Sequence, residues 1–251
     1  MVSSGAARNI MRAVPKQRML TAFAWAVHLY TGLGAALGLL AIYFAAESDF
    51  RASFMAMGAA TFIDSSDGPL ARLLNVKVRT PSFDGALLDN IVDYLTYVAA
   101  PVFLMLWAGV IPDSKLGLLL ACFVMVAASY GFCQTNAKTQ DHYFLGFPNY
   151  WNLIAFYLYC LDWGNIFNVA ILVSFGVMVF IPIRFIYPNR TVPLRPLTLT
   201  LGVVWAAITI LMLIMLPEIN RILLFASLSF IVYYLLASFA LHARAVRAAH
   251  L

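Results

Sequence analysis

The sequence predicts an all-α, polytopic membrane protein, a bundle of about eight transmembrane helices preceded by an N-terminal amphipathic helix. Composition is the first observation behind this prediction, because 63% of the 251 residues are hydrophobic and only 11% are charged. A soluble domain is about half apolar and about a quarter charged. The second observation is a series of long apolar runs, and the third is the distribution of basic residues between them.

Composition also argues against several other classes of protein. The formal net charge of +5 is modest, so we expect no nucleic-acid partner. The three cysteines, Cys122, Cys133 and Cys160, form no CxxC pair, and their odd number argues against a disulfide framework. Residues 1–20 are basic but lack the apolar core and cleavage site of a signal peptide, so none is expected.

Residues 1–20 are predicted to form a basic segment on the cytoplasmic side of the membrane. Ile10, Met11 and Val14 would give a short surface helix its apolar face, and Pro15 would limit the length of that helix. A frayed basic tail fits the same residues equally well. Residues 21–251 are expected to form a single membrane domain.

Eight segments approach the ~20 apolar residues that a spanning helix needs. They are residues 21–46, 52–74, 84–109, 115–134, 147–161, 165–187, 196–216 and 219–241. The fifth segment is short and rich in aromatic residues. The second and third contain aspartates, so a scan of hydropathy alone would miss the second.

The basic residues indicate how these segments are oriented, because Lys and Arg accumulate in the cytoplasmic loops of membrane proteins. With the N-terminus inside, thirteen of the sixteen basic residues fall on the cytoplasmic side, whereas Arg51, Lys115 and Arg221 fall outside. We therefore expect eight spans with both termini in the cytoplasm. Six spans would fit the charges almost as well if one helical hairpin were miscounted.

Four aspartates lie inside the predicted spans, namely Asp64, Asp67, Asp89 and Asp93. A carboxylate in the hydrocarbon region costs about 3 kcal/mol or more, so such residues are functional candidates. The spacings are i,i+3 and i,i+4, which place each pair on one face of its helix. A cytoplasmic loop over residues 75–83 lets the two helices pack antiparallel. The four carboxylates are therefore expected to converge near the cytoplasmic end.

Four converging carboxylates repel one another unless a cation lies between them. Hard oxygen ligands without His or Cys suit Mg²⁺, Mn²⁺ or Ca²⁺. A pair of such ions can clamp a phosphoryl group during its transfer. A proton relay or an ion pathway is the alternative interpretation, since both also need buried carboxylates.

Residues beside the aspartates fit a phosphate ligand. Gly68, Ala71 and Gly85 are small enough to let a ligand approach closely, and Arg72 can reach an anionic phosphate. For each small residue taken singly, close packing of a neighbouring helix is a sufficient reason.

Asp84 and His28 are expected to have structural roles. Asp84 stands one residue before Gly85 and is predicted to cap the third span at its N-terminus. His28, near the start of the first span, is expected to make an interhelical hydrogen bond rather than to bind metal.

The acidic stretch resembles the signature of the CDP-alcohol phosphotransferase family, D-x-x-D-G-x-x-A-R followed by a spacer and G-x-x-x-D-x-x-x-D. All eight defined positions are filled, by Asp64, Asp67, Gly68, Ala71, Arg72, Gly85, Asp89 and Asp93. The spacer from Leu73 to Asp84 has twelve residues, which is longer than in most of the family. It resembles the bacterial branch that makes phosphatidylcholine, as do residues 138–152 and 181–191.

The resemblance implies that the phosphatidyl group of CDP-diacylglycerol is transferred to choline, giving phosphatidylcholine and CMP. It implies divalent cofactors, Mn²⁺ or Mg²⁺ and two ions, held against the diphosphate by Asp64, Asp67 and Asp89. Asp93 would share a metal and act as the general base for the choline hydroxyl. Gly68, Ala71, Arg72 and Gly85 would shape the CDP site.

The resemblance also implies a setting for the reaction. We expect a multi-pass protein of the bacterial inner membrane whose active site faces the cytoplasm, and the family often forms homodimers. Lys138 and Arg184 are further candidates to bind the diphosphate or an anionic lipid headgroup, although both also fit topology anchors. Arg184 is favoured because it falls within the predicted sixth span.

Choline is a quaternary ammonium, which the faces of aromatic rings attract. Five aromatic residues near the predicted cytoplasmic ends are candidates for its pocket: Tyr94, Tyr143, Tyr150, Trp151 and Tyr187. Tyrosine and tryptophan also form belts at membrane interfaces, which is the alternative explanation for each of them.

Two competing functions stay open at the level of sequence. The same transfer to serine or inositol would need a different pocket, since an amino-acid acceptor requires a partner for its carboxylate. A cation-coupled transporter would also need buried acids, but transporters often repeat their broken helices in both halves. The chain has one acidic helix pair and no second copy, which disfavours transport.

Overall fold

The computed structural model describes residues 4–137, 139, 141, 143–188 and 191–249, with side chains from Gln17 to Arg247 in those ranges. Helices dominate the described residues, as the sequence predicted. They are α1 (Ser4–Ala46), α2 (Phe50–Leu73), α3 (Val76–Arg79), α4 (Gly85–Asp93), the π-helix η1 (Tyr94–Ala99), α5 (Ala100–Trp107), α6 (Lys115–Cys133), α7 (Trp151–Leu161), α8 (Asn165–Met178), α9 (Arg195–Met215) and α10 (Arg221–Ala249). The strands β1 (Tyr143–Leu145) and β2 (Arg184–Ile186) were not predicted.

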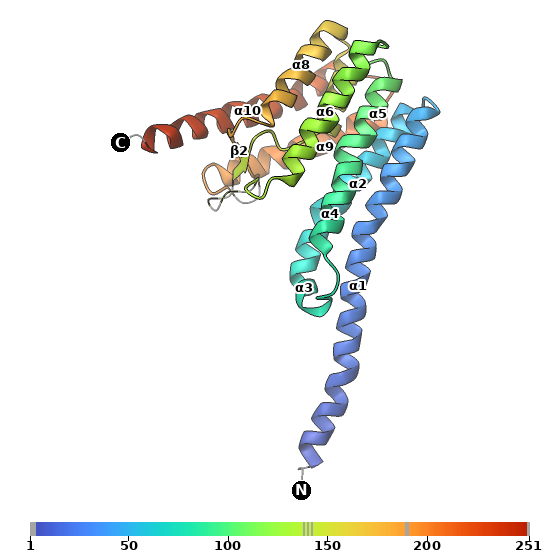
Figure 1. Ribbon diagram of the computed structural model, residues 1–251, viewed down its shortest axis with the longest axis vertical. Helices are drawn as coiled ribbons and strands as arrows, with labels where there is room; N and C mark the ends of the chain where they lie inside the picture. The colour runs from blue at the N-terminus through green and yellow to red at the C-terminus, as the bar shows by residue number, and fades with distance from the viewer. Residues whose placement is uncertain (1–3, 138, 140, 142, 189–190, 250–251) are drawn as a thin grey trace.

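Helix α1 packs against α2 through a tight turn. The Asp49 carboxylate accepts a hydrogen bond from the Ala52 amide at 2.9 Å and caps α2, and the Ser53 hydroxyl donates to the Ala41 carbonyl at 2.7 Å. The N-terminal part of α1 projects beyond the other helices (Figure 1). Helix α1 is continuous through Pro15, so a separate surface helix over residues 1–20 is not confirmed. A proline removes a single backbone hydrogen bond, and here the helix continues on both sides of it.

Helices α4, η1 and α5 follow one another without a break and form one rod. Asp84 begins this rod, because its carboxylate accepts hydrogen bonds from the amides of Ala86 at 3.1 Å and Leu87 at 3.0 Å. The predicted cap is therefore confirmed. The rod lies beside α2 and α1, so the short helix α3 and its flanking turns close one end of the packed helices (Figure 1).

Five helices among the described residues are long and apolar enough to cross a membrane. They are Gln17–Ala46, Gly85–Trp107, Lys115–Cys133, Arg195–Met215 and Arg221–Arg247. Helix α2 is not among them because it carries both arginines and aspartates, as the sequence anticipated. Helices α7 and α8 have 11 and 14 residues, fewer than the ~20 that a span needs. The predicted count of eight spans is not confirmed.

The predicted sixth span, residues 165–187, is wrong in its second half. Helix α8 ends at Met178, and the chain then passes Pro182 and enters β2. Proline has no amide hydrogen to continue a helix, which accounts for the interruption. Arg184 therefore lies on a strand and not within a spanning helix.

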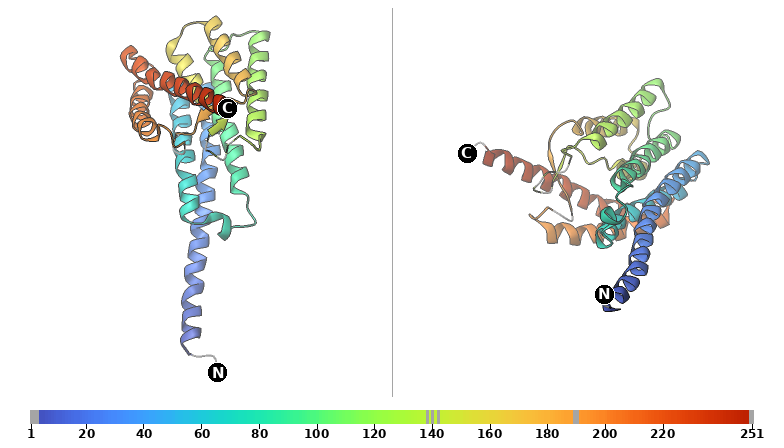
Figure 2. Two further views of the ribbon diagram at one scale, coloured as in Figure 1. Left: turned by 90° about the vertical axis from the view of Figure 1, so that its left-hand side faces the viewer. Right: turned by 60° about the horizontal axis from the view of Figure 1, so that its bottom comes forward.

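The two strands pair antiparallel, with Phe144 opposite Phe185. Helix α10 holds β2 along one side, because its Ser238 hydroxyl accepts from the Ile186 amide at 3.1 Å and its Tyr234 hydroxyl donates to the Ile186 carbonyl at 3.0 Å. Helices α9 and α10 run obliquely to helices α1 to α6 (Figure 2). Phe185 and Trp151 are fully buried in the core between these parts.

Removing the cap at Asp84 should destabilise the rod that carries two of the aspartates. We expect Asp84→Ala to lower the free energy of unfolding by about 1 kcal/mol, because two amides of the first turn lose their acceptor. Thermal unfolding in detergent measures this. Asp84→Asn keeps an acceptor oxygen and is the matched control, so equal losses in the two variants would contradict the capping role.

Candidate active site

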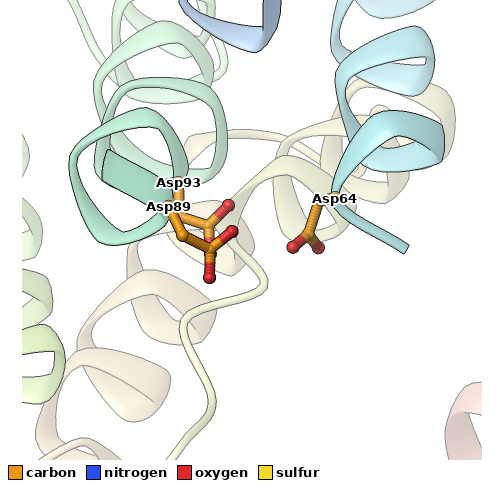
Figure 3. A group of neighbouring side chains, drawn as sticks. All are labelled: Asp64, Asp89 and Asp93. Atoms are coloured by element: carbon orange, nitrogen blue, oxygen red, sulfur yellow. The ribbon is translucent and has the colours of Figure 1, made fainter. Parts of the chain in front are cut away.

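Three aspartates from two helices meet between α2 and α4. Asp64 comes from α2, whereas Asp89 and Asp93 come from successive turns of α4 (Figure 3). Each offers a carboxylate oxygen, and these oxygens all lie within 4.8 Å of one another. All three side chains are half-buried. The i,i+4 spacing explains why the two α4 carboxylates point the same way.

Tyr97 orients the Asp64 carboxylate. Its hydroxyl donates a hydrogen bond to Asp64 Oδ2 at 2.7 Å. Tyr97 lies in η1, four residues after Asp93, so it continues the series that Asp89 begins. Single π turns inside α-helices are often found at functional sites. The sequence prediction missed Tyr97, although extending the i,i+4 series by one step would have found it.

Asp67 does not join the group of three. Its side chain is buried, and its Oδ2 accepts a hydrogen bond from the Thr31 hydroxyl of α1 at 2.7 Å. The i,i+3 spacing leaves Asp67 rotated by about 60° from Asp64 around α2, which turns it toward α1. The expected convergence of four carboxylates is thus met by three of them, and Asp67 lies beside the group.

A cleft of about 1000 Å³ adjoins the aspartates and is bounded by α1, α2, α3 and the start of α4. Asp67 and Asp89 both line it. So do the four residues predicted for the CDP site, Gly68, Ala71, Arg72 and Gly85. Lys77 of α3 adds a second cation, which the sequence prediction did not include in the site. The cleft therefore has cationic groups near its carboxylates, which suits an anionic ligand held with metal ions.

The two motif glycines differ in what surrounds them. A Cβ at Gly85 would lie 2.7 Å from His28 Cε1, so α1 occupies the space that a side chain would need. At Gly68 the nearest atom to such a Cβ is Arg72 Nη1 at 3.4 Å, an ordinary contact. Close helix packing therefore explains Gly85, whereas Gly68 borders the open cleft.

The two cations predicted outside the motif are not brought to the aspartate group by any described contact. Arg184 Nη1 forms an ion pair with Asp141 Oδ2 at 2.8 Å, and its guanidinium carbon lies 5.8 Å from the centre of the Tyr143 ring. Burial raises the pKa of the Tyr143 phenol, and the Asp141 carboxylate adds to that rise. Lys138 lies outside the described residues.

The five aromatic candidates fall into different environments. The Tyr150 phenol lies within electrostatic range of the Asp64 carboxylate and of Tyr187. Trp151 is fully buried, and its indole N–H donates to Asn149 Oδ1 at 3.1 Å. The Tyr94 hydroxyl donates to the Met125 carbonyl on α6, and Tyr143 packs beside Arg184. Among these candidates, Tyr150 is linked electrostatically to Asp64, and Tyr187 is linked to Tyr150.

The donor set fits a hard divalent cation. All three ligands are carboxylates, their oxygens lie within 4.8 Å of one another, and three half-buried negative charges need compensation. Asp64, Asp89 and Asp93 could hold such an ion, which would neutralise charge on a bound phosphate.

Comparison with known proteins agrees with this site. A family model described as CDP-alcohol phosphatidyltransferase matches residues 19–186. The chain belongs to this family. The matched range contains the aspartates, the cleft and Tyr150.

Curated relatives cover most of the chain. The phosphatidylcholine synthase of Legionella pneumophila is 38% identical over 86% of this chain and 87% of its own length. That of Mesorhizobium japonicum is 36% identical over 82% of this chain and 78% of its own length. That of Pseudomonas aeruginosa is 34% identical over 80% of this chain and 84% of its own length.

Loss of the Tyr97 hydroxyl should weaken metal binding. In Tyr97→Phe the ring remains but Asp64 loses the hydrogen bond that orients it, so we expect Mn²⁺ to bind about 10- to 100-fold more weakly. Titration of the purified protein with Mn²⁺, followed by electron paramagnetic resonance, measures this without turnover. Tyr94→Phe removes a hydroxyl directed at α6 instead and should bind Mn²⁺ normally. Equal affinities in the two variants would overturn the role of Tyr97.

Adding a methyl group at the two motif glycines should separate their roles. We expect Gly85→Ala to lower the free energy of unfolding by about 1 to 3 kcal/mol, because its Cβ must displace the His28 ring. Gly68→Ala should leave thermal stability nearly unchanged. The two variants are compared by thermal unfolding, and a larger loss at Gly68 would contradict the packing described.

Proposed function

We propose that the chain is a phosphatidylcholine synthase, which transfers the phosphatidyl group of CDP-diacylglycerol to choline and releases CMP. The observation that carries this proposal is the convergence of Asp64, Asp89 and Asp93 beside a cleft that holds Arg72. Curated relatives named phosphatidylcholine synthase support it over most of the chain. Family membership makes a cation-coupled transporter a poor explanation for the same aspartates.

The residues of the site account for each part of the reaction. Divalent ions, when bound, would neutralise the diphosphate of the donor. Arg72 and Lys77 would hold the anionic donor in the cleft. The Asp93 carboxylate would accept the proton of the choline hydroxyl. The choline oxygen then bonds to the phosphorus that carries the diacylglycerol, and the bond from that phosphorus to the oxygen of CMP breaks.

The surroundings of the cleft suit a lipid-linked donor. The side chains of Leu73 and Leu87 are exposed and stand close in sequence to the cleft residues Arg72 and Gly85. The acyl chains of the donor would remain in lipid beside such surfaces, while the nucleotide enters the polar cleft. The distribution of Lys and Arg supports a site on the cytoplasmic side with both termini inside, and the bacterial relatives support placement in the inner membrane.

The acceptor would bind on the Asp64 side of the group. The Tyr97 hydroxyl donates a hydrogen bond to the Asp64 carboxylate. The Tyr150 phenol interacts electrostatically with Asp64 and with Tyr187. Tyrosine rings attract quaternary ammonium groups. Serine would require a cation for its carboxylate, and the candidate Arg184 is paired with Asp141 instead. Choline is therefore favoured over serine. The proposed choline pocket therefore contains Tyr150 and Tyr187, which the sequence predicted, and Tyr97, which it did not.

Three parts of the proposal rest on the family resemblance. We propose Mn²⁺ or Mg²⁺ as the ion, a second ion that Asp67 would help to bind, and a homodimer as the assembly. Asp67 lines the cleft beside Asp89, so a modest change in its hydrogen bonding would let it face a bound diphosphate.

Choline-dependent release of CMP tests the function. Purified protein in detergent is given CDP-diacylglycerol and Mn²⁺ or Mg²⁺ with choline, serine, inositol or no acceptor. We expect release with choline only, and a loss of at least about 100-fold in Asp93→Asn because the proton acceptor is removed. Release with serine or inositol instead would overturn the acceptor, and no release from folded protein would overturn the function.

The ring of Tyr150 should contribute to choline binding. We expect Tyr150→Leu to raise the KM for choline about 3- to 30-fold while the KM for CDP-diacylglycerol stays unchanged, since a cation–π contact is lost. Tyr150→Phe keeps the ring and should raise it much less. Steady-state kinetics with each substrate varied in turn measures both constants. A choline KM that is the same in all three proteins would remove Tyr150 from the pocket.

A further inference from the structure

The connection between α2 and α4, residues 74–84, contains α3 and is attached to α1 by a buried hydrogen bond. His28 Nε2 lies 2.9 Å from Thr80 Oγ1, and both side chains are buried. The Thr80 hydroxyl also donates to the Val76 carbonyl at 3.0 Å, so it accepts from the His28 Nε2–H. The predicted interhelical bond of His28 is thus confirmed, with its partner at the C-terminus of α3.

Apolar contacts on the same side of α1 reinforce this attachment. The Phe83 ring centre lies 4.4 Å from that of His28 and 5.3 Å from that of Trp25. Val76 is buried and packs with Ala24 and Val27 of α1. Two successive turns of α1 therefore hold the beginning and the end of the connection.

The same connection forms one wall of the cleft. The connection contributes Lys77, Pro81 and Phe83 to the lining of the cleft. Helix α2 contributes Asp67 and Gly68 to the same lining. The position of Lys77 relative to Asp67 therefore depends on how the connection is fixed to α1. The connection is also held internally, because Arg79 Nε donates a hydrogen bond to the Leu74 carbonyl at 2.8 Å.

We propose that His28 and Thr80 are positioning residues for the donor, which fix the α3 connection as the wall against which CDP-diacylglycerol binds. This inference rests on the proposed function and deepens it, because it assigns the determinants of donor binding to α1 and α3. The buried carboxylate of Asp67 and the side chain of Lys77 both border the cleft. The phenol hydroxyl that binds Asp64 belongs to η1 instead. A loosened α3 wall should therefore weaken donor binding without affecting choline.

Variants that each remove one partner of the hydrogen bond test the inference. Thr80→Val keeps the shape of the side chain but cannot accept from His28, and His28→Phe keeps a ring against Phe83 but cannot donate. Each should raise the KM for CDP-diacylglycerol about three- to tenfold, as expected for one lost hydrogen bond. The kcat at saturating donor and the KM for choline should stay within about twofold. Thr80→Ser retains the hydroxyl, so its KM for CDP-diacylglycerol should equal that of the unmodified protein.

The double variant separates this bond from a general loss of structure. If the two side chains act through one hydrogen bond, His28→Phe/Thr80→Val should raise the donor KM no more than the larger single effect. Thermal unfolding is recorded for each protein, so that loss of folded protein is recognised. Independent, multiplicative effects of the two substitutions would overturn the proposal, and so would equal rises in the KM for choline and for the donor.

Direct binding of CDP-diacylglycerol distinguishes a failure of this inference from a failure of the proposed function. The Kd for the donor is measured in detergent for the unmodified protein and for the three single variants, without an acceptor. A weaker Kd in Thr80→Val and His28→Phe, restored in Thr80→Ser, supports the positioning role even if no acceptor yields CMP. An unchanged Kd overturns it, and absence of donor binding by the unmodified protein overturns both proposals.

Discussion

The meeting of Asp64 with Asp89 and Asp93 between two helices is the constraint on which the rest of the site depends. Carboxylates in an apolar bundle are costly, so each needs a hydrogen-bond donor, a cation or water. The structure supplies hydroxyl donors from two sides, Tyr97 to Asp64 and Thr31 to Asp67. The short connection between Leu73 and Gly85 makes α2 and α4 antiparallel, which places both acidic turns at the same end of the bundle.

Helix α2 divides the site into two sides. The Asp64 carboxylate accepts a hydrogen bond from Tyr97 of η1 and interacts electrostatically with Tyr150, whereas Asp67 bonds to Thr31 of α1 and lines the cleft. A spacing of three residues gives both carboxylates access to the same region while turning them toward different neighbours. This arrangement suits a reaction with two substrates, in which a lipid-linked nucleotide and a small alcohol must approach one phosphorus from opposite directions.

Parts of the chain that are distant in sequence meet beside the proposed acceptor pocket. The two short strands bring residues near Phe144 beside those near Phe185, and the Phe144 ring stacks on Tyr187 with 4.5 Å between ring centres. Helix α10 fixes this sheet through Ser238 and Tyr234, whose i,i+4 spacing presents both hydroxyls to β2. Helix α10 therefore holds the segment that leads to Tyr187, a residue of the proposed choline pocket.

The sequence by itself determined the helical class, the acidic motif, the family and the cap at Asp84, because each depends on residue types at short, regular spacings. Tertiary structure alone decided that Asp67 turns toward α1, that Tyr97 completes the group, and that Trp151 is buried in the core. It also decided that α8 ends at Met178, and that β1, which precedes α7, pairs with β2, which follows α8. Such features depend on which surfaces meet, and an apolar run looks the same in sequence whether it faces lipid, a neighbouring helix or a substrate.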